Sequence, residues 1–192
     1  MSEKTPSRRR TILNSADIDR VLTRIAHEIL ESNRGSDRLI LMGIAHKGIP
    51  LAHRLGQKIA ASDAQFDPKQ SVGQLDVTMY RDDLRNNPGR SLVLTQLPNQ
   101  GLDGKNLLLV DDVLYSGRTV RAALDALNGL GRPALVRLAV LIDRGHRQLP
   151  IRADHVGKNL PTSSLEKVVV SLEESHSPQD RVEIVQHEEA DQ

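Results

Sequence analysis

Two adjacent acidic residues, Asp111 and Asp112, follow an apolar run at Leu107–Val110. The segment Ser116–Thr119 comes shortly after them, with one glycine and two hydroxyl side chains, and leads into a helical pattern. Consecutive backbone N–H groups at the start of a helix form a binding site for an anion such as phosphate. Carboxylates would repel that phosphate, so the two acids are expected to face sugar hydroxyls or Mg²⁺ instead. The segment therefore predicts a site for a sugar phosphate.

A simpler explanation is that the two acids only end a strand and cap the next turn of the chain, and for an Asp-Asp pair alone it would be preferred. The glycine, the two hydroxyls and the helix start favour the binding site. Two other phosphate-binding patterns are absent from the sequence. Without Gly-x-x-x-x-Gly-Lys-Ser/Thr, or Gly-x-Gly-x-x-Gly after a strand, we expect neither a P-loop ATPase nor a dinucleotide site.

A sheet must position these acids, and the hydrophobic pattern indicates one. Apolar or alternating runs predict strands at 39–44, 72–80, 107–110, 135–142 and 167–172, with 92–97 as the returning strand of a hairpin. Helical spacing predicts helices at about 16–33, 50–61 and 118–130. Strands that alternate with helices imply a mostly parallel sheet covered on both faces. Such sheets bind ligands at the C-terminal ends of their strands, where the loops Ala45–Gly48, Asp111–Thr119 and Asp143–Arg147 begin.

The composition limits the possible classes of protein. The chain has 192 residues and no cysteine, which excludes disulfides and thiol catalysis and fits a cytoplasmic protein. It has no apolar stretch near the roughly 20 residues of a membrane-spanning helix. Only Phe66, Tyr80 and Tyr115 are aromatic, so we expect an aliphatic core and little stacking of bases on aromatic rings.

The sequence Val110–Thr119 resembles the motif that binds phosphoribosyl pyrophosphate (PRPP) in type I phosphoribosyltransferases. Other segments resemble the PyrR family within that group, which combines regulation of pyrimidine operons with uracil phosphoribosyltransferase activity. These segments are Leu22–Glu28, Asp76–Leu84, Asp143–Asp154 and Gly157–Asn159. The resemblance implies an α/β fold with a mostly parallel central sheet, helices on both faces, a flexible hairpin and a small hood.

The resemblance covers about residues 12–172, which we expect to form one phosphoribosyltransferase domain. Residues 1–11, with Arg8-Arg9-Arg10, are expected to be a flexible basic tail. Residues 173–192 are mostly acidic and are expected to be partly ordered at most.

The family resemblance also implies an activity and its residues. Uracil would displace pyrophosphate from PRPP, with Mg²⁺ as cofactor, to give uridine monophosphate (UMP). Asp111 and Asp112 would hold the ribose hydroxyls, directly or through Mg²⁺. The 5′-phosphate loop would consist of Val113, Leu114, Tyr115, Ser116, Gly117, Arg118 and Thr119. The pyrophosphate loop would be Ala45, His46, Lys47 and Gly48; the flexible loop would contribute Arg81 and Asp82; and Ile142, Asp143 and Arg144 would recognise uracil.

Two loops depart from the pattern that is usual in the family. Ser116 stands where threonine is common, and this change keeps the hydroxyl. Ala45-His46-Lys47 stands where Lys-Thr-Arg is common, so one fixed positive charge is lost. We therefore expect weaker pyrophosphate binding or slower turnover.

PyrR proteins bind a hairpin in the messenger RNA of the pyrimidine (pyr) operon, more tightly when a uridine nucleotide such as UMP or UTP is bound. The matching candidates for RNA contacts are Thr23, Arg24, His27, Arg147, Arg152 and Lys158. Polar and cationic side chains suit RNA phosphates and 2′-hydroxyl groups. Each residue alone could equally be a solvated surface side chain, and only the joint match favours RNA binding.

Two alternatives to a bifunctional regulator remain at this point. One is a phosphoribosyltransferase for another base, without RNA regulation. The other is an RNA-binding nucleotide sensor with little catalytic activity. The sequence leaves open whether RNA binding attenuates transcription or represses translation. The resemblance implies a homodimer or a higher homo-oligomer and no membrane partner.

Overall fold

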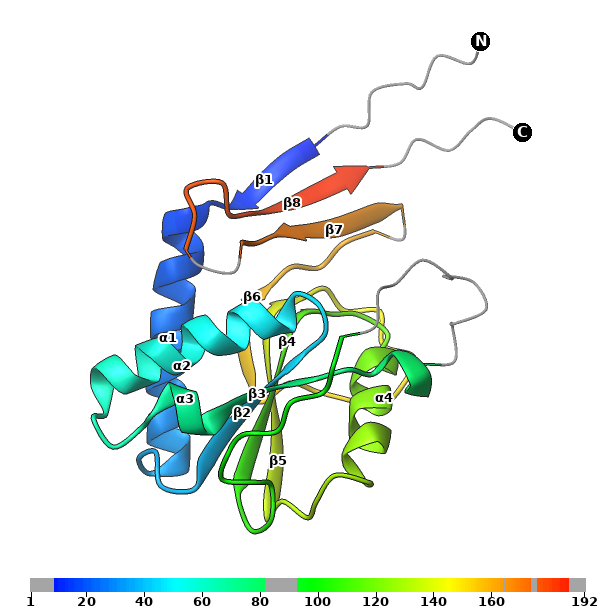
Figure 1. Cartoon of the computed structure of the whole chain (residues 1–192). Helices are drawn as coiled ribbons and strands as arrows, with labels where there is room; N and C mark the ends of the chain where they lie inside the picture. Colours follow the sequence, from blue (N-terminus) through cyan, green and yellow to red (C-terminus); the bar gives the residue numbers. More distant parts are fainter. Residues whose placement is uncertain (1–8, 82–92, 164, 174–175, 187–192) are drawn as a thin grey trace.

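The computed structural model describes residues 9–81, 93–163, 165–173 and 176–186. Its centre is a five-stranded parallel sheet with the strand order β3-β2-β4-β5-β6 (Figure 1). The strands are β2 (Leu39–Ile44), β3 (Val72–Leu75), β4 (Asn106–Leu114), β5 (Leu135–Asp143) and β6 (His155–Asn159). The expected α/β architecture with a parallel sheet is confirmed.

Helices cover both faces of this sheet. The helices α1 (Ser15–Asn33) and α2 (Gly48–Ser62) lie on one face, and α4 (Arg118–Leu127) lies on the other (Figure 1). Alternate strand residues enter opposite cores, since Leu41 packs with α1 and α2 whereas Ile40 and Met42 pack with α4. Both cores are almost entirely aliphatic, as the composition predicts. Among the described residues, no helix is long and apolar enough to cross a bilayer.

A second, three-stranded antiparallel sheet lies over the C-terminal ends of the main strands (Figure 1). It consists of β1 (Arg9–Leu13), β8 (Arg181–Gln186) and β7 (Glu166–Ser171), and we call it the hood. Its strands β1 and β8 come from segments that the sequence places in the basic tail and the acidic C-terminal segment. The residues from Val182 to Val185 of β8 are nevertheless all buried, and the three apolar residues among them hold the strand in the hood.

The structure corrects several expected boundaries. β3 ends at Leu75 rather than Tyr80, and a short 3₁₀ helix, η1 (Thr78–Tyr80), follows it. Residues 93–97 form no strand, and only a single bridge joins Gln96 to Gln74. The short helix α3 (Pro68–Ser71) and the strand β6 were not expected. These elements are too short for a periodic pattern to reveal them.

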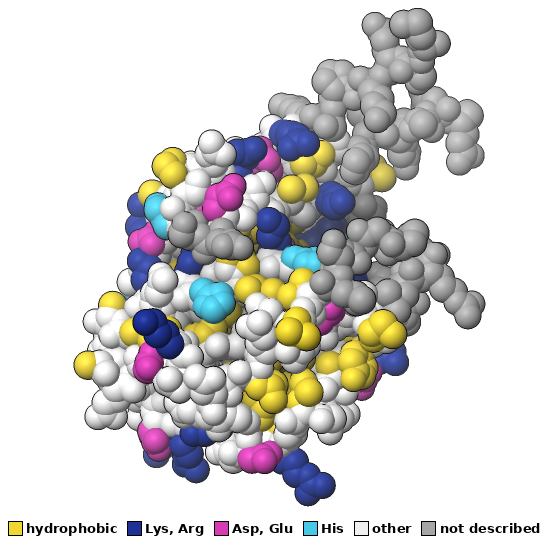
Figure 2. All heavy atoms as spheres, in the orientation of Figure 1, with side chains coloured by type: hydrophobic (Ala, Val, Ile, Leu, Met, Phe, Trp, Pro, Cys, Tyr) yellow, Lys and Arg dark blue, Asp and Glu magenta, His cyan; other side chains and the backbone are white. Residues whose placement is uncertain are grey.

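Two corrections concern the segment around the paired acids. β4 continues through Asp111 and Asp112 to Leu114, because this part of the strand still pairs with β5. α4 ends at Leu127 instead of Leu130, where Asn128-Gly129 disfavours further helix. Figure 2 shows hydrophobic side chains on the surface over η1 and α4, to which the exposed Met79, Tyr80 and Leu124 belong.

Candidate active site

The three loops predicted to form the site do converge at one edge of the main sheet. α2 begins at Gly48 and packs so closely on β4 that a Cβ atom at this position would lie 2.3 Å from the Val110 carbonyl oxygen. On the other side of β4, Leu114 pairs with Asp143, and the Arg144 N–H donates to the Leu114 carbonyl over 3.1 Å. The loop Ala45–Gly48 therefore lies on one side of the paired acids, and Asp143–Arg147 lies on the other.

The paired acids lie in a buried position that disfavours two negative charges. Asp111 is buried and Asp112 is half-buried. Burial, together with the neighbouring charge of Asp112, raises the pKa of Asp111 well above its usual value. Burial also raises the pKa of Asp112. A cation or hydroxyl donors from a ligand would relieve this repulsion.

The two carboxylates fit a metal ion only if a ligand supplies the rest of its coordination. Among the residues that the structure describes, no group of three or more potential metal-binding side chains occurs. Mg²⁺ takes six oxygen ligands and commonly binds one or two carboxylates together with substrate phosphates and water. The pair therefore suits a magnesium ion that arrives with the substrate.

The phosphate loop borders a cavity of about 290 Å³ at the end of β4. The cavity is lined by Arg81, Asp111, Gln148 and the residues from Val113 to Val120. Gly117 has φ +92°, a conformation that favours glycine, and it precedes the first turn of α4. Arg81 reaches this loop and donates to the Thr119 hydroxyl over 2.9 Å. Its expected companion Asp82 lies outside the described residues.

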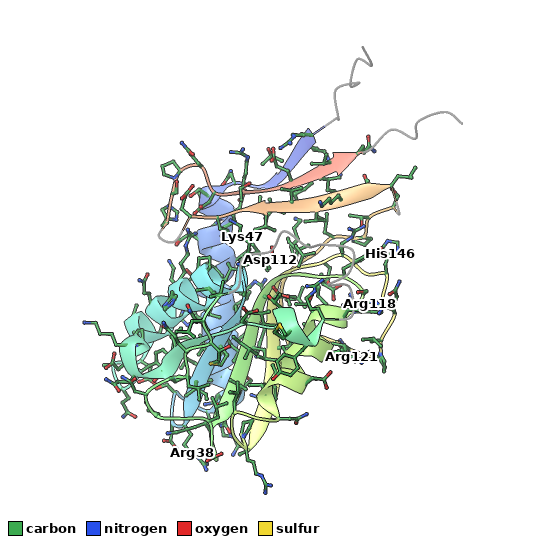
Figure 3. The ribbon with its side chains drawn as sticks, turned by 45° about the vertical axis from the view of Figure 1, so that its right-hand side comes forward. Arg38, Lys47, Asp112, Arg118, Arg121 and His146 are labelled. Atoms are coloured by element: carbon green, nitrogen blue, oxygen red, sulfur yellow. The ribbon has the colours of Figure 1, made fainter. Side chains whose placement is uncertain are left out.

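The pyrophosphate loop presents two exposed side chains, His46 and Lys47. The positive charge of Lys47 acts on Asp112, and Figure 3 shows these two residues next to each other beneath the hood. The Lys47 ammonium also donates to the carbonyl of Leu172, the residue that follows β7 of the hood, over 3.2 Å. One of the cations available for a pyrophosphate is therefore already engaged with the protein.

The side chains of the segment predicted to recognise uracil have partners within the protein. Ile142 is fully buried. The Asp143 carboxylate accepts hydrogen bonds from the Gly145 N–H and the Arg147 guanidinium. The Arg144 guanidinium stacks on the Tyr115 ring at 4.2 Å and donates to the Glu166 carbonyl. The side chains of Asp143 and Arg144 are therefore already engaged within the protein.

Arg147, which the sequence assigns to RNA contacts, is half-buried and contacts the phosphate loop. Its guanidinium donates to the Tyr115 carbonyl over 2.9 Å and to the Asp143 carboxylate over 2.5 Å. The neighbouring Gln148 lines the cavity and accepts from the Arg118 guanidinium over 2.9 Å. The sequence carries no signal for Gln148, because its partners lie 30 residues away and form no local pattern.

Comparison with known proteins decides the family. Residues 9–174 match the phosphoribosyl transferase domain family. The Bifunctional protein PyrR of Streptomyces coelicolor is 59% identical over 165 residues, which cover 86% of this chain and 84% of that protein. The Bifunctional protein PyrR of Leifsonia xyli subsp. xyli is 58% identical, over 86% of this chain and 91% of its own. The chain belongs to the PyrR family.

Solved structures agree on the fold of this PyrR family member. The hypoxanthine phosphoribosyltransferase of Trypanosoma cruzi superposes with a TM-score of 0.66 at 17% identity, and the match covers 93% of this chain and 97% of that one. A hypoxanthine-guanine phosphoribosyltransferase from Bacillus anthracis gives a TM-score of 0.61 at 16% identity, over 82% and 86%. At such identities the likeness supports the type I phosphoribosyltransferase fold alone.

The remaining candidates for RNA contacts in this PyrR family member gather around β6, an edge strand of the main sheet. Arg24 of α1 donates to the carbonyls of Val156 and Gly157 in β6, and it also pairs with Glu28. His27 is exposed on the same helix, whereas the Thr23 hydroxyl donates to the Asp19 carbonyl. Lys158 and Arg152, the first in β6 and the second shortly before it, are exposed and complete this group.

Proposed function

We propose that the protein converts uracil and PRPP to UMP and pyrophosphate, and that it also binds pyr mRNA to regulate pyrimidine biosynthesis genes in response to uridine nucleotides. The observation that carries the enzymatic half is a cavity that Asp111, the first of the paired acids, lines together with the loop proposed to bind the 5′-phosphate. The similarity of the chain to bifunctional PyrR proteins over most of its length supports both the enzymatic and the regulatory half of the proposal.

The proposed reaction assigns a role to each loop. N1 of uracil forms a bond to C1 of PRPP and loses its proton, while the bond from C1 to the pyrophosphate oxygen breaks. Asp111 and Asp112 orient the ribose hydroxyls, and Ser116–Thr119 hold the 5′-phosphate. His46 and Lys47 face the leaving pyrophosphate, and the positive charge of Arg81 adds to the same cavity. Mg²⁺ that arrives with PRPP would neutralise charge on the leaving group.

The RNA-binding half of the proposal uses the surface around β6. Arg24, His27, Arg152 and Lys158 lie there with exposed side chains and can contact phosphates or 2′-hydroxyls. Arg147, the remaining candidate, contacts the phosphate loop through the Tyr115 carbonyl. A role in phosphate contacts predicts an RNA affinity that falls as the salt concentration rises.

The pyrophosphate loop favours a second candidate, an RNA-binding nucleotide sensor with little turnover. Ala45 carries no charge, and the Lys47 ammonium is engaged with the Leu172 carbonyl. Both features leave fewer cations for pyrophosphate. This candidate retains nucleotide and RNA binding but loses most of the catalytic rate.

The experiment that separates these functions measures nucleotide formation from PRPP and Mg²⁺ with uracil, hypoxanthine, guanine and orotate. We expect UMP from uracil and no product from the other bases. Product from another base alone would contradict the uracil assignment. Binding of UMP without any turnover would favour the nucleotide sensor.

We also propose a homo-oligomer that acts in the cytoplasm, where PRPP and mRNA are found. The exposed Met79, Tyr80 and Leu124 over η1 and α4 offer an apolar surface for a second copy of the chain. Light scattering of the purified protein measures the mass directly. A monomer at micromolar concentration would contradict this part of the proposal.

A further inference from the structure

Asp76 lies between β3 and η1 and joins two segments that are separate in the sequence. One carboxylate oxygen accepts the Thr78 N–H over 2.7 Å, and the other accepts the Val93 N–H over 2.7 Å. The Asp76 N–H donates to the Thr95 hydroxyl over 3.0 Å. Three polar groups of one residue therefore hold the chain that leads to Arg81 against the segment that contains Val93 and Thr95.

Neighbouring contacts strengthen this junction. Gln74 and Gln96 exchange two backbone hydrogen bonds of 2.9 Å, and the Gln74 side chain donates to the Leu94 carbonyl over 2.7 Å. On the other side, the Ala45 N–H donates to the Leu75 carbonyl over 3.0 Å. The end of β3 is thus connected to the pyrophosphate loop as well.

The junction is connected to Arg81 through Thr78. Thr78, whose N–H binds Asp76, begins η1, and its carbonyl accepts the Arg81 N–H over 3.4 Å. Arg81 then extends to the cavity and donates to the Thr119 hydroxyl. Its positive charge also acts on Asp111. A shift at Thr78 would therefore move the guanidinium relative to both the phosphate loop and the paired acids.

We propose that Asp76 is a positioning residue that holds Arg81 at the PRPP cavity, an inference that rests on the function proposed above. A carboxylate suits this role because each of its two oxygens accepts one N–H group. Burial by itself raises the pKa of Asp76, but hydrogen bonds from Thr78 and Val93 and the nearby His46 outweigh this effect and lower it. The group remains ionised at neutral pH and accepts both hydrogen bonds.

The test compares variants that remove single hydrogen bonds of this junction. Asp76→Asn retains one acceptor oxygen and places an NH₂ group against the second N–H. Thr95→Val removes the hydroxyl that accepts from Asp76, whereas Thr95→Ser retains it. We expect kcat/KM for PRPP to fall about tenfold or more in Asp76→Asn, because small displacements of a binding group can cost up to about a hundredfold. Thr95→Val should lower kcat/KM for PRPP, whereas Thr95→Ser should keep it near the wild-type value.

Asp63→Asn is the matched control. The Asp63 carboxylate also accepts N–H groups from two separate segments, at Ser36 and Gln65, and hydrogen bonds lower its pKa too. It follows α2 and contributes nothing to the lining of the cavity. Asp63→Asn should leave kcat/KM for PRPP unchanged.

A double-mutant cycle distinguishes positioning from a general structural role. If Asp76 acts through Arg81, the double variant Asp76→Asn/Arg81→Ala should lose no more activity than Arg81→Ala alone. Losses that add fully, or an Asp76→Asn enzyme with normal kcat/KM, would overturn the inference. PRPP affinity, measured by calorimetry in the same four proteins, should show the same non-additivity.

The calorimetry also separates the two proposals. If the wild-type protein binds PRPP but forms no UMP, the proposed enzymatic function fails, and the cycle in PRPP affinity still decides the role of Asp76. If UMP forms and the losses are additive, only the role of Asp76 is contradicted.

Discussion

Asp111 is the residue at which function most clearly opposes stability. It is buried next to a second carboxylate, and its pKa in the folded protein is raised well above the ordinary value by burial and by Asp112. A carboxyl group whose pKa is higher in the folded protein than in the unfolded chain stabilises the folded state fully when the pH lies below the unfolded pKa. This stabilisation is lost as the pH rises through the pKa of the folded state.

Asp111→Asn should therefore stabilise the protein at neutral pH while it abolishes UMP formation. The amide oxygen can still accept the Asp112 N–H, a hydrogen bond of 2.9 Å in the wild type, so the local geometry is retained. Removal of one buried charge should add about 1 kcal/mol, which is about 2–4 °C in Tm for a chain of this size. Thermal unfolding at several pH values checks this. The gain in Tm should shrink as the pH falls, and a lower Tm than wild type at neutral pH would contradict the account.

Arg147 provides the second prediction at this scale. Its guanidinium binds the Tyr115 carbonyl and the Asp143 carboxylate, so Arg147→Gln should disturb the phosphate loop and the base segment together. We expect kcat/KM to fall about tenfold or more, with weaker RNA binding as well. The exposed Arg152 is the control, and Arg152→Gln should weaken RNA binding with normal UMP formation. If both variants reduced turnover equally, the proposed division between Arg147 at the phosphate loop and Arg152 at the RNA surface would be wrong.

The contrast between Asp111 and Arg147 shows what the sequence can predict for single residues. The paired acids stand next to a glycine, two hydroxyls and a helix start, so their surroundings are local and visible in the sequence. Arg147 and Asp76 act mainly through backbone N–H groups and carbonyls, which carry no sequence signal. Resemblance to a family names such residues but does not say what they touch.

At the scale of elements, one buried ion pair attaches the hood to the main domain. Arg54 of α2 and Asp180, which precedes β8, lie 2.6 Å apart with side chains 6% and 1% exposed. The Asp180 carboxylate also accepts the N–H groups of Glu173 and Ser177, and Arg54 donates to the Glu173 carbonyl. This pair holds the connection between β7 and β8 against α2, and thereby holds the hood over the site.

Arg54→Met should destabilise the protein by about 3–5 kcal/mol, because it leaves a buried carboxylate without its partner. Burial raises the pKa of Asp180, but hydrogen bonds from Arg54, Ser177 and Glu173 outweigh it, so the pKa is lowered overall. In the wild type this stabilisation is therefore present above the pKa of Asp180 in the unfolded chain, and it is lost as the pH falls through the lower folded value. Urea unfolding at several pH values measures both effects.

The double variant Arg54→Met/Asp180→Leu serves as the control for this prediction. It removes both charges and should be more stable than Arg54→Met alone. If the double variant were less stable than Arg54→Met, the unpaired Asp180 carboxylate would not be the cause of the instability of the single variant.

The elements differ in how well the sequence predicts them. The bounds of β2 and α1 agree with expectation almost to the residue. β2 is marked by a wholly apolar run, and α1 by a long helical pattern that begins after the capping residue Asn14. β8 was not expected, since its three apolar residues form only a short run within an acidic segment. β3 was expected to be longer, because the alternation continues past Leu75, where the hydrogen bonds of Asp76 turn the chain into η1 instead.

At the scale of the whole molecule, one segment connects the proposed PRPP cavity to the proposed RNA surface. The segment from Asp143 to Arg152 begins in the stretch proposed to bind uracil, contacts the phosphate loop through Arg147, and leads into β6. A nucleotide that changes the conformation of this segment would also change the position of the side chains proposed to contact RNA. Any such coupling is reciprocal, so RNA should also tighten nucleotide binding by the same factor.

We propose above that this one protein recognises a uridine nucleotide and pyr mRNA together. The most direct measurement is the affinity for pyr leader RNA at a fixed salt concentration, with and without saturating UMP. We predict specific RNA binding that UMP tightens by about fivefold or more, within the usual range of coupling between two sites. The absence of RNA binding, or an affinity that is the same with and without UMP, would contradict the account.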